Sequence, residues 1–533
     1  MRSRLKEVLK KCESDHVPNL SHKELFLATT DILPVADDKK TWGSWTFVGF
    51  WVADCFNLNT FLIASSMITA GLNWWQSLLC VIVGYTMVGP FIVLNARPRA
   101  VHGLVFPSVC RTTFGVFGTF WPIFTRASIA CYGHVDRLHN FPCNLLALSL
   151  PTIWVPIHKL RWLLFAKAIV GPMAGLTLLG WSVQRAGGAG PIFSQPATLH
   201  GSKLAWQMVT SIGDCFGNLV TLIVNAPDFA SRAKTPSASV WSQLITMPLG
   251  FSITSFLGIV ICSASAVQYG QPIWNVVKIM ETMLNGADSK TRAGLAFIAM
   301  GFIYVTYITI RRGGYIAAIV GICINPWLLY KSPQTLTKFL AANGIFLACI
   351  AGPMISDYWF VRRGHMRIND LYVADKKGWY WYTRGINRRG YLAMSCGFAI
   401  NLPGFIGTLQ PSIKLSSGAM RIYYMMWLTG PGVSGLAYYL FCLISPPQGM
   451  NRHFEEIDES SGEPRIDHRI TNMAQTQNNQ ETTVLNVIDT NSEIEGGRTD
   501  GDDGDREVSP NEGSALRQRV NTDTNTNTPA PQV

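Results

Sequence analysis

A short stretch inside an apolar segment carries a cluster of polar side chains. Residues 50–60 read Phe-Trp-Val-Ala-Asp-Cys-Phe-Asn-Leu-Asn-Thr, which places Asp54, Asn57, Asn59 and Thr60 within seven residues. Such groups are costly inside a membrane span and usually face a cavity, and Asn and Asp favour turns over helix interiors. The cluster therefore predicts a broken helix that lines a site for a small polar molecule or a cation. The alternative is a polar contact that only joins neighbouring helices.

A second copy of this pattern lies 160 residues further along the chain. Residues 214–216 repeat the Asp-Cys-Phe of residues 54–56 and are followed by Asn218. Both copies sit in apolar segments that are five spans apart, which is typical of an inverted repeat whose two halves each begin with a helix broken at the bilayer midplane. We therefore expect a second break, where free N–H and carbonyl groups hold a substrate and a cation.

Motifs for enzymatic chemistry are missing from the sequence. It contains no H-E-x-x-H, G-x-S-x-G or G-x-x-x-x-G-K-[ST] pattern. The twelve cysteines form no C-x-x-C pair, which argues against a zinc site or a disulfide framework. The sequence therefore predicts no enzyme, no cofactor and no bound metal, and any transport would draw on an ion gradient.

The elements that position these groups are membrane spans. Only 14% of the 533 residues are charged, compared with about 25% in soluble domains. The basic residues flank apolar runs, so the net charge of +11 does not indicate a nucleic-acid partner. Twelve runs approach the roughly 20 apolar residues that a span requires: 44–71, 76–96, 112–132, 143–158, 161–183, 205–229, 239–267, 293–310, 313–330, 337–361, 390–408 and 420–445. The third, fourth and eighth runs are weak, because they are short or are interrupted by Arg126 or prolines.

The placement of Lys and Arg predicts the topology of the chain. With the N-terminus inside, the cytoplasmic loops carry 17 of these residues and the external loops about ten, as the positive-inside rule requires. We therefore expect a plasma-membrane protein with both termini in the cytosol, in which residues 1–43 form an N-terminal tail and residues 44–445 a domain of about twelve helices. Residues 446–533 hold 17 acidic residues and seven Arg but few core formers, which predicts a disordered tail. This tail is either a solvated tether or a segment for the trafficking machinery.

Nine motifs recur in order between residues 25 and 450: residues 41–45, 50–60, 64–67, 73–76, 95–98, 225–229, 311–316, 356–358 and 401–405. Together they resemble the Fur-type branch of the nucleobase:cation symporter-1 family, the fungal permeases for uracil, allantoin and uridine. The resemblance implies an all-α, LeuT-like fold of five plus five inverted-repeat helices with two added helices. It also implies a secondary transporter for a nucleobase-like ring.

The resemblance assigns roles to several residues near the two Asp-Cys-Phe copies. Asn57 matches the polar residue of the first helix that faces the substrate, and the carbonyls of Ala53 and Phe56 match positions that frame a cation. Asn218 and Leu219 fall where the sixth helix lines the site, although the family has an aromatic residue at Leu219.

Four further residues complete the predicted machinery. We expect Asn59 to support substrate binding and Asp54 to couple proton transfer to transport, since a buried carboxylate can bind a proton near neutral pH; a structural hydrogen bond is the alternative for Asp54. Asn401 and Phe405 interrupt the eleventh run and are gating candidates, with helix packing as the alternative. The transported ion is a proton or sodium.

Two departures from the family pattern bear on activity. The third helix of the family continues with Trp-Tyr-Gly-x-Gln, but here Tyr132-Gly133 runs into His134, so both the Trp and the Gln are missing. The eighth helix lacks its Asn- and Ser-rich part after Tyr307. Helices 3, 4 and 8 are therefore predicted to be truncated. The leading hypothesis is proton-coupled import of a ring such as uracil, allantoin or uridine, and the alternative is a non-transporting paralogue or a mis-spliced gene product.

Overall fold

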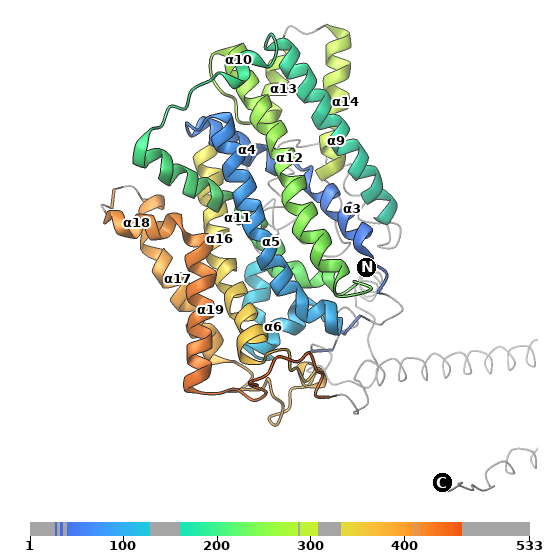
Figure 1. Ribbon diagram of the computed structural model, residues 1–533, viewed down its shortest axis with the longest axis vertical. Coiled ribbons are helices and arrows are strands. Elements are labelled where there is room, and N and C mark those ends of the chain that lie inside the picture. Colours follow the sequence, from blue (N-terminus) through green and yellow to red (C-terminus); the bar gives the residue numbers. More distant parts are fainter. Residues whose placement is uncertain are drawn as a thin grey trace, which may run out of the picture. The chain divides into compact units, whose positions relative to one another are not determined.

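The protein folds into a bundle of helices (Figure 1). This computed structural model describes residues 27–28, 32–35, 40–127, 160–285, 288–306, 332–410, 412–413 and 415–460. Over these ranges, β-pairing is confined to three isolated bridges. The helices are α3 (Ser44–Cys55), α4 (Leu58–Thr69), α5 (Trp74–His102), α6 (Phe106–Phe114), α9 (Leu160–Arg185), α10 (Gly190–Phe193), α11 (Gly201–Ala230), α12 (Ala238–Tyr269), α13 (Val276–Leu284), α14 (Ser289–Thr306), α16 (Pro333–Ser356), α17 (Arg388–Leu409), α18 (Ser417–Tyr424) and α19 (Met426–Ile444), with a π-helical turn η4 (Asp357–Val361) and a 3₁₀ turn η5 (Asn369–Leu371).

Several helices are built to cross a membrane. In the described part of the chain, six are long and apolar enough to do so, and the bent pair α3 and α4 makes a seventh. Their outward faces carry large apolar side chains, including Leu79, Ile82, Ile245, Leu249 and Leu436, which suits contact with lipid. The all-α, multi-pass membrane architecture is therefore confirmed.

The helix ends follow from local sequence signals, of which α5 is the clearest. At its start the side chain of Asn73 accepts a hydrogen bond from the Gln76 N–H at 3.0 Å, and the Gln76 side chain accepts one from the Asn73 N–H at 3.1 Å. This reciprocal capping box satisfies two N–H groups that a helix start otherwise leaves free. At its end Gly103 adopts the left-handed conformation (φ +70°) that glycine tolerates. The 29-residue helix between them is the central partner of the site described below.

The predicted break in the sixth span is wrong, because α11 runs without interruption from Gly201 to Ala230. Asn follows Asp-Cys-Phe directly in the first copy but one residue later in the second, after Gly217. The extra residue places Asn218 one turn from Asp214 on the same helix face. The Asn218 side chain hydrogen-bonds Asn59 of α4 and Tyr85 of α5, whereas Asn57 uses its side chain to cap a helix.

The predicted interruption of the eleventh span is also wrong, because α17 continues through Pro403. Asn401 lies fully buried, donating to the Gly397 carbonyl at 3.0 Å and accepting from the Thr429 hydroxyl of α19 at 2.9 Å. Phe405 packs beside Tyr423 of α18, with ring centroids 6.4 Å apart. These contacts fit helix packing, the alternative that the sequence left open, and the gating role of the two residues stays a prediction.

The weak runs are described only in part. The third run begins within α6, is helical again from residue 120 to 127, and then leaves the described residues. The fourth run (143–158) and the ninth (313–330) lie outside them, and the eighth ends as α14 at Thr306. The predicted truncations of helices 3, 4 and 8 fall at these places.

Helices α5 and α11 pack closely and run parallel at the centre of the bundle (Figure 1). Contacts follow in the same order along both: Gly84 lies against Cys215, and the Asn95 amide donates to the Ile223 carbonyl at 2.7 Å. A Cβ at Gly84 would lie 2.7 Å from the Cβ of Cys215, so a larger residue would force the helices apart. This register places polar groups of α5 directly beside those of α11.

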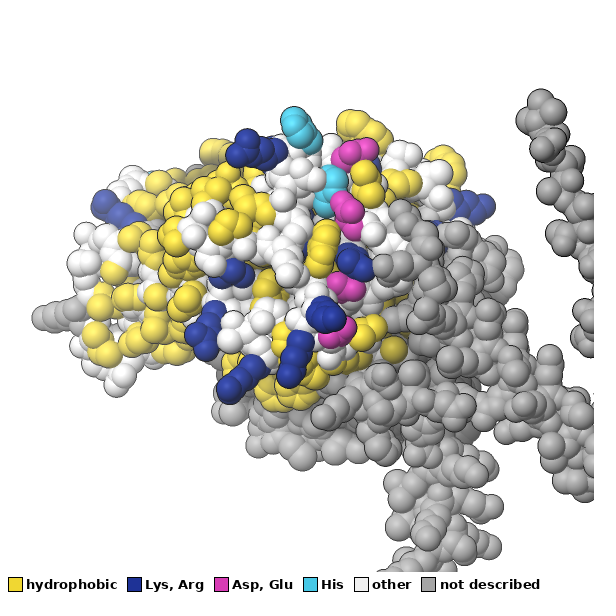
Figure 2. Space-filling view, turned by 90° about the horizontal axis from the view of Figure 1, so that it is seen from below, with side chains coloured by type: hydrophobic (Ala, Val, Ile, Leu, Met, Phe, Trp, Pro, Cys, Tyr) yellow, Lys and Arg dark blue, Asp and Glu magenta, His cyan; other side chains and the backbone are white. Residues whose placement is uncertain are grey.

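Several connecting loops lie together at one end of the bundle, and we call it the basic end. It comprises residues 97–119, 226–237, 362–388 and 446–460, and the stretch from Arg362 to Arg389 alone holds eight Lys and Arg. Figure 2 shows Lys and Arg side chains spread over this face among Asp, Glu and His.

The first part of the predicted C-terminal tail is packed on the basic end. Phe454 stacks on Trp359 with ring centroids 5.2 Å apart, and the Met366 N–H donates to the Ile457 carbonyl at 3.0 Å. Glu456 accepts two hydrogen bonds from Arg97, each of 2.8 Å. Order thus extends at least to residue 460, beyond the predicted boundary at 446, because these residues find partners on the bundle. Residues 461–533 lie outside the described part.

We expect Glu456→Gln to loosen this segment. Burial would raise the pKa of Glu456, but hydrogen bonds from Arg97 and Tyr358 outweigh it and hold that pKa below its usual range. The ion pair therefore stabilises docking at neutral pH and is lost as the pH falls through the depressed pKa. Because the pair is partly exposed, its loss should cost about 1 kcal/mol, or roughly fivefold in the opening equilibrium.

Trypsin cleavage after Arg452 in the purified protein measures this opening. Glu455→Gln is the matched control, since Glu455 is the exposed neighbour. Equal cleavage rates for the two variants would contradict the prediction.

Candidate functional site

The first span is broken where the polar cluster predicts. Helices α3 and α4 meet at an angle of 55° across Phe56 and Asn57. The Asn57 Oδ1 accepts from the Thr60 N–H at 2.9 Å and its hydroxyl at 3.1 Å, which caps the start of α4. The Asn57 Nδ2 donates to the Asp54 carbonyl at 2.7 Å. A single side chain therefore holds both half-helices at the break.

This capping role gives a prediction that separates two functions of Asn57. Asn57→Ala should remove about 1 kcal/mol of stability through the lost cap and should lower uptake. Asn57→Ser keeps a capping oxygen, so it should restore folding. Uptake that also returns with Ser would show that the cap suffices, whereas uptake that stays absent in a folded Asn57→Ser protein would point to direct substrate contact. Thermal stability and uptake of the two variants are the measurements.

A chain of three polar side chains lies beside the break. The Asn59 Nδ2 donates to the Asn218 Oδ1 at 2.7 Å, and the Asn218 Nδ2 donates to the Tyr85 hydroxyl at 3.2 Å. The chain joins α4, α11 and α5, and Tyr85 is fully buried. The Asn59 Oδ1 is shielded from solvent and has no hydrogen-bond partner among the described residues. The structure thus brings Asn59 and Asn218 together as the sequence suggested and leaves one acceptor open.

The remaining predicted residues flank this chain. Leu219 follows Asn218 and is buried in the main core. Ala53 is buried in the last turn of α3, and Phe56 is the residue at which α3 ends. Helix C-termini leave carbonyl oxygens free, so these two positions are where a cation would find backbone ligands. Their role as ligands stays a prediction.

Two carboxyl groups belong to the site region. Asp54 lies in the last turn of α3 and is partly exposed, and its backbone carbonyl accepts from Asn57. Asp214 of α11 is only 2% exposed, and its Oδ1 has no hydrogen-bond partner among the described residues. A carboxylate is costly to bury without donors, so Asp214 is a second proton-carrying candidate beside Asp54.

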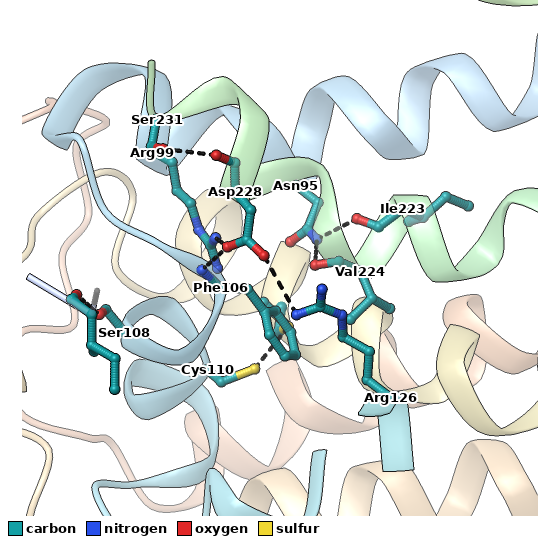
Figure 3. Close-up of polar contacts among 12 residues, drawn as sticks. Asn95, Arg99, Phe106, Ser108, Cys110, Arg126, Ile223, Val224, Asp228 and Ser231 are labelled. Carbon is teal, nitrogen blue, oxygen red and sulfur yellow. Dashed lines mark hydrogen bonds and ion pairs between the residues drawn. The ribbon is translucent and has the colours of Figure 1, made fainter. Parts of the chain in front are cut away.

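A charged cluster ties the same helices together at the basic end. Asp228 of α11 accepts from the Arg99 Nη1 of α5 at 3.1 Å and from the Phe106 N–H at the start of α6 at 2.7 Å. Its second oxygen lies 3.4 Å from the Arg126 Nη1. Figure 3 shows both guanidinium groups converging on this carboxylate, with the Phe106 ring between them. The cluster joins the ends of α5 and α11 to the start of α6.

The fold and the site together define a class of protein. A membrane bundle in which a broken helix places half-helix ends beside the central helices is the architecture of a secondary transporter. A family model described as permeases for cytosine/purines, uracil, thiamine and allantoin matches residues 34–134 and 145–430. The chain belongs to this family, the nucleobase-cation symporter-1 family.

Named relatives and solved structures agree with this placement. The chain is 34% identical to the allantoin permease of Saccharomyces cerevisiae over 81% of this chain and 78% of that protein, and 34% identical to the uracil permease of the same yeast over 80% and 77%. Mhp1, a nucleobase-cation-symport-1 family transporter solved in a closed conformation with bromovinylhydantoin bound, superposes with a TM-score of 0.62 at 20% identity, covering 80% of this chain and 98% of Mhp1. The resemblance and the LeuT-like fold expected from the motifs are thereby confirmed, and the relatives are permeases rather than enzymes.

Two groups of the site were not found by sequence reasoning. Tyr85 lies in an apolar helix without a motif around it, and the unpaired oxygen of Asp214 depends on which neighbours surround it. No signal in the sequence distinguishes Tyr85 from Thr86, the polar residue next to it in the same apolar run. Only the contact between α5 and α11 reveals the partner of Tyr85.

Proposed function

We propose that this protein imports a nucleobase-like ring, of the uracil, allantoin or uridine class, by symport with a cation. The observation that carries the proposal is the partly buried Asn59–Asn218–Tyr85 chain beside the break, which ends in an acceptor that has no donor among the described residues. A planar ring with amide N–H and carbonyl groups matches such a site, since a buried polar group rejects ligands that leave it unpaired. The yeast relatives, named for allantoin and uracil, support the same ring class.

A proton is the proposed coupling ion. Asp54 and the buried Asp214 flank the break and the chain of polar side chains, and either carboxyl group would carry a proton in its neutral form. The carbonyls of Ala53 and Phe56 are the proposed ligands if sodium is used instead. Asn57 contributes through the break that it holds, with direct ring contact as its second role, and Leu219 packs behind Asn218.

Uptake of labelled uracil, allantoin and uridine by cells that lack their own permeases tests the function. We expect uptake of at least one ring that rises when the outside is acidified and does not require sodium. A protein that reaches the plasma membrane but takes up none of the three would overturn the proposal.

The same proposal includes the membrane and the two tails. The eight Lys and Arg between Arg362 and Arg389 support a cytosolic location for the basic end. The packed residues 446–460 lie at that end, so the C-terminal tail is proposed to be cytosolic and open to the trafficking machinery. Labelling of cysteines introduced on either side of intact cells would decide the orientation.

A non-transporting protein is the second candidate. The family match stops at residue 134 and resumes at 145, next to Gly133, where the aromatic motif of the third helix is missing. Sequencing of the full-length transcript decides between the two. Extra in-frame residues with Trp-Tyr-Gly-x-Gln would favour the symporter, and a transcript that matches this chain would favour the non-transporting form.

A further inference from the structure

The side chain of Tyr85 closes the polar chain at the end far from the break. Its hydroxyl accepts from the Asn218 Nδ2 at 3.2 Å, and its ring packs on Phe251 of α12 with centroids 4.8 Å apart. The side chain is fully buried. Its position is therefore fixed by two helices other than the broken span.

A chain of two amides has a direction, because each amide has a donor end and an acceptor end. In the structure the donors point from Asn59 through Asn218 to Tyr85, which leaves the Asn59 Oδ1 without a donor from the part of the chain that the structure describes. In the reverse direction the Tyr85 hydroxyl would donate to Asn218, and Asn59 would present a free N–H group. A tyrosine hydroxyl can donate or accept, so the direction depends on its other partners. The Tyr85 hydroxyl also hydrogen-bonds the side chain of Cys215 on α11, and a proton directed to that sulfur leaves the hydroxyl oxygen to accept from Asn218, which makes Asn59 an acceptor.

We propose that Tyr85 is a positioning residue for substrate selectivity: it holds the Asn59–Asn218 chain in the direction that makes the Asn59 Oδ1 an acceptor for a ring N–H group. The inference rests on the proposed function. If Asn59 offers an acceptor, the substrate must be a ring that presents an N–H donor to it. A ring methylated at that nitrogen leaves the buried oxygen unpaired and adds a clash, so it binds poorly.

Removal of the hydroxyl should relax this selectivity. In Tyr85→Phe the Asn218 Nδ2 loses its acceptor, so neither direction of the chain is favoured, and Asn59 can present either end of its amide. Thr86→Val is the matched control, since it deletes a hydroxyl from the next residue of α5, which faces outward.

Competition against labelled uracil uptake by uracil, 1-methyluracil and 3-methyluracil measures the selectivity, with surface protein quantified in parallel. We expect at least one methylated ring to compete about tenfold or more worse than uracil in the wild type and in Thr86→Val. In Tyr85→Phe this ratio should fall to about threefold or less.

A structural role would lower surface protein and maximal uptake for every ring alike and leave the ratio unchanged. An unchanged ratio in Tyr85→Phe, or equal competition by all three rings in the wild type, overturns the inference while the proposed function stands. A wild type that takes up no ring overturns the proposed function and this inference with it.

Discussion

Replacement of Asp357 by alanine should nearly abolish folded protein. Asp357 and Arg362 are each about 1% exposed, and the Asp357 Oδ2 lies 3.2 Å from the Arg362 Nε. Its other oxygen accepts from the Tyr438 hydroxyl at 2.8 Å. Removal of one partner of a buried pair strands the other charge and typically costs about 3–5 kcal/mol. Thermal unfolding of the purified protein and its amount at the membrane are the measurements.

The double variant Asp357→Leu/Arg362→Met separates the stranded charge from lost packing. Without either charge the desolvation cost disappears, so this variant should be more stable than Asp357→Ala. Asp375→Asn, an exposed carboxylate in the same loop, should change stability by less than about 0.5 kcal/mol. An Asp357→Ala protein within 1 kcal/mol of the wild type would contradict the argument.

The second large effect is expected from Asp228→Ala. Arg99 is fully buried, and Asp228 is the carboxylate that faces it at 3.1 Å. The loss of this carboxylate leaves the guanidinium buried with an uncompensated charge, and the Phe106 N–H at the start of α6 loses its acceptor. We expect a cost of about 3–5 kcal/mol. Thermal unfolding together with uptake measures it.

Arg126 provides a graded control in the same cluster. Its Nη1 lies 3.4 Å from Asp228 and its side chain is 24% exposed, so Arg126→Gln should cost at most about 1 kcal/mol. We therefore expect Asp228→Ala to cost much more stability than Arg126→Gln, because Arg99 is buried and Arg126 is partly exposed. Equal effects of the two variants would show that the cluster acts through net charge rather than through the buried Arg99.

Much of the fold was available from the sequence, because apolar runs of about 20 residues have one stable form in a bilayer. The runs 76–96, 205–229, 239–267 and 390–408 match α5, α11, α12 and α17 with ends shifted by a few residues. The break at Asn57 was also predictable, because it depends on local contacts. The Asn57 side chain hydrogen-bonds residues only three positions before and after it in the sequence.

The errors arose where local signals compete with packing. Asn218 and Asn401 look like helix breakers in sequence, yet both lie in continuous helices because neighbouring helices satisfy their side chains. The order of residues 446–460 was missed for the same reason. That segment is too polar to form a core of its own, but Glu456 and Phe454 find partners on the bundle.

By itself the sequence determined the class of protein, the first break and those spans that the described residues include, and it singled out Asn59 and Asn218, whose role toward the substrate stays a prediction. These depend on hydrophobicity and on contacts between near neighbours, which a linear pattern records. Only the tertiary structure decided that Tyr85 completes the polar chain, that Asp228 neutralises Arg99 and that α11 stays unbroken. The two contacts pair residues more than 100 positions apart in the sequence, and helix packing fixes which side chains meet. Helix α11 stays unbroken because Asn218 bonds to other helices instead of capping a new one.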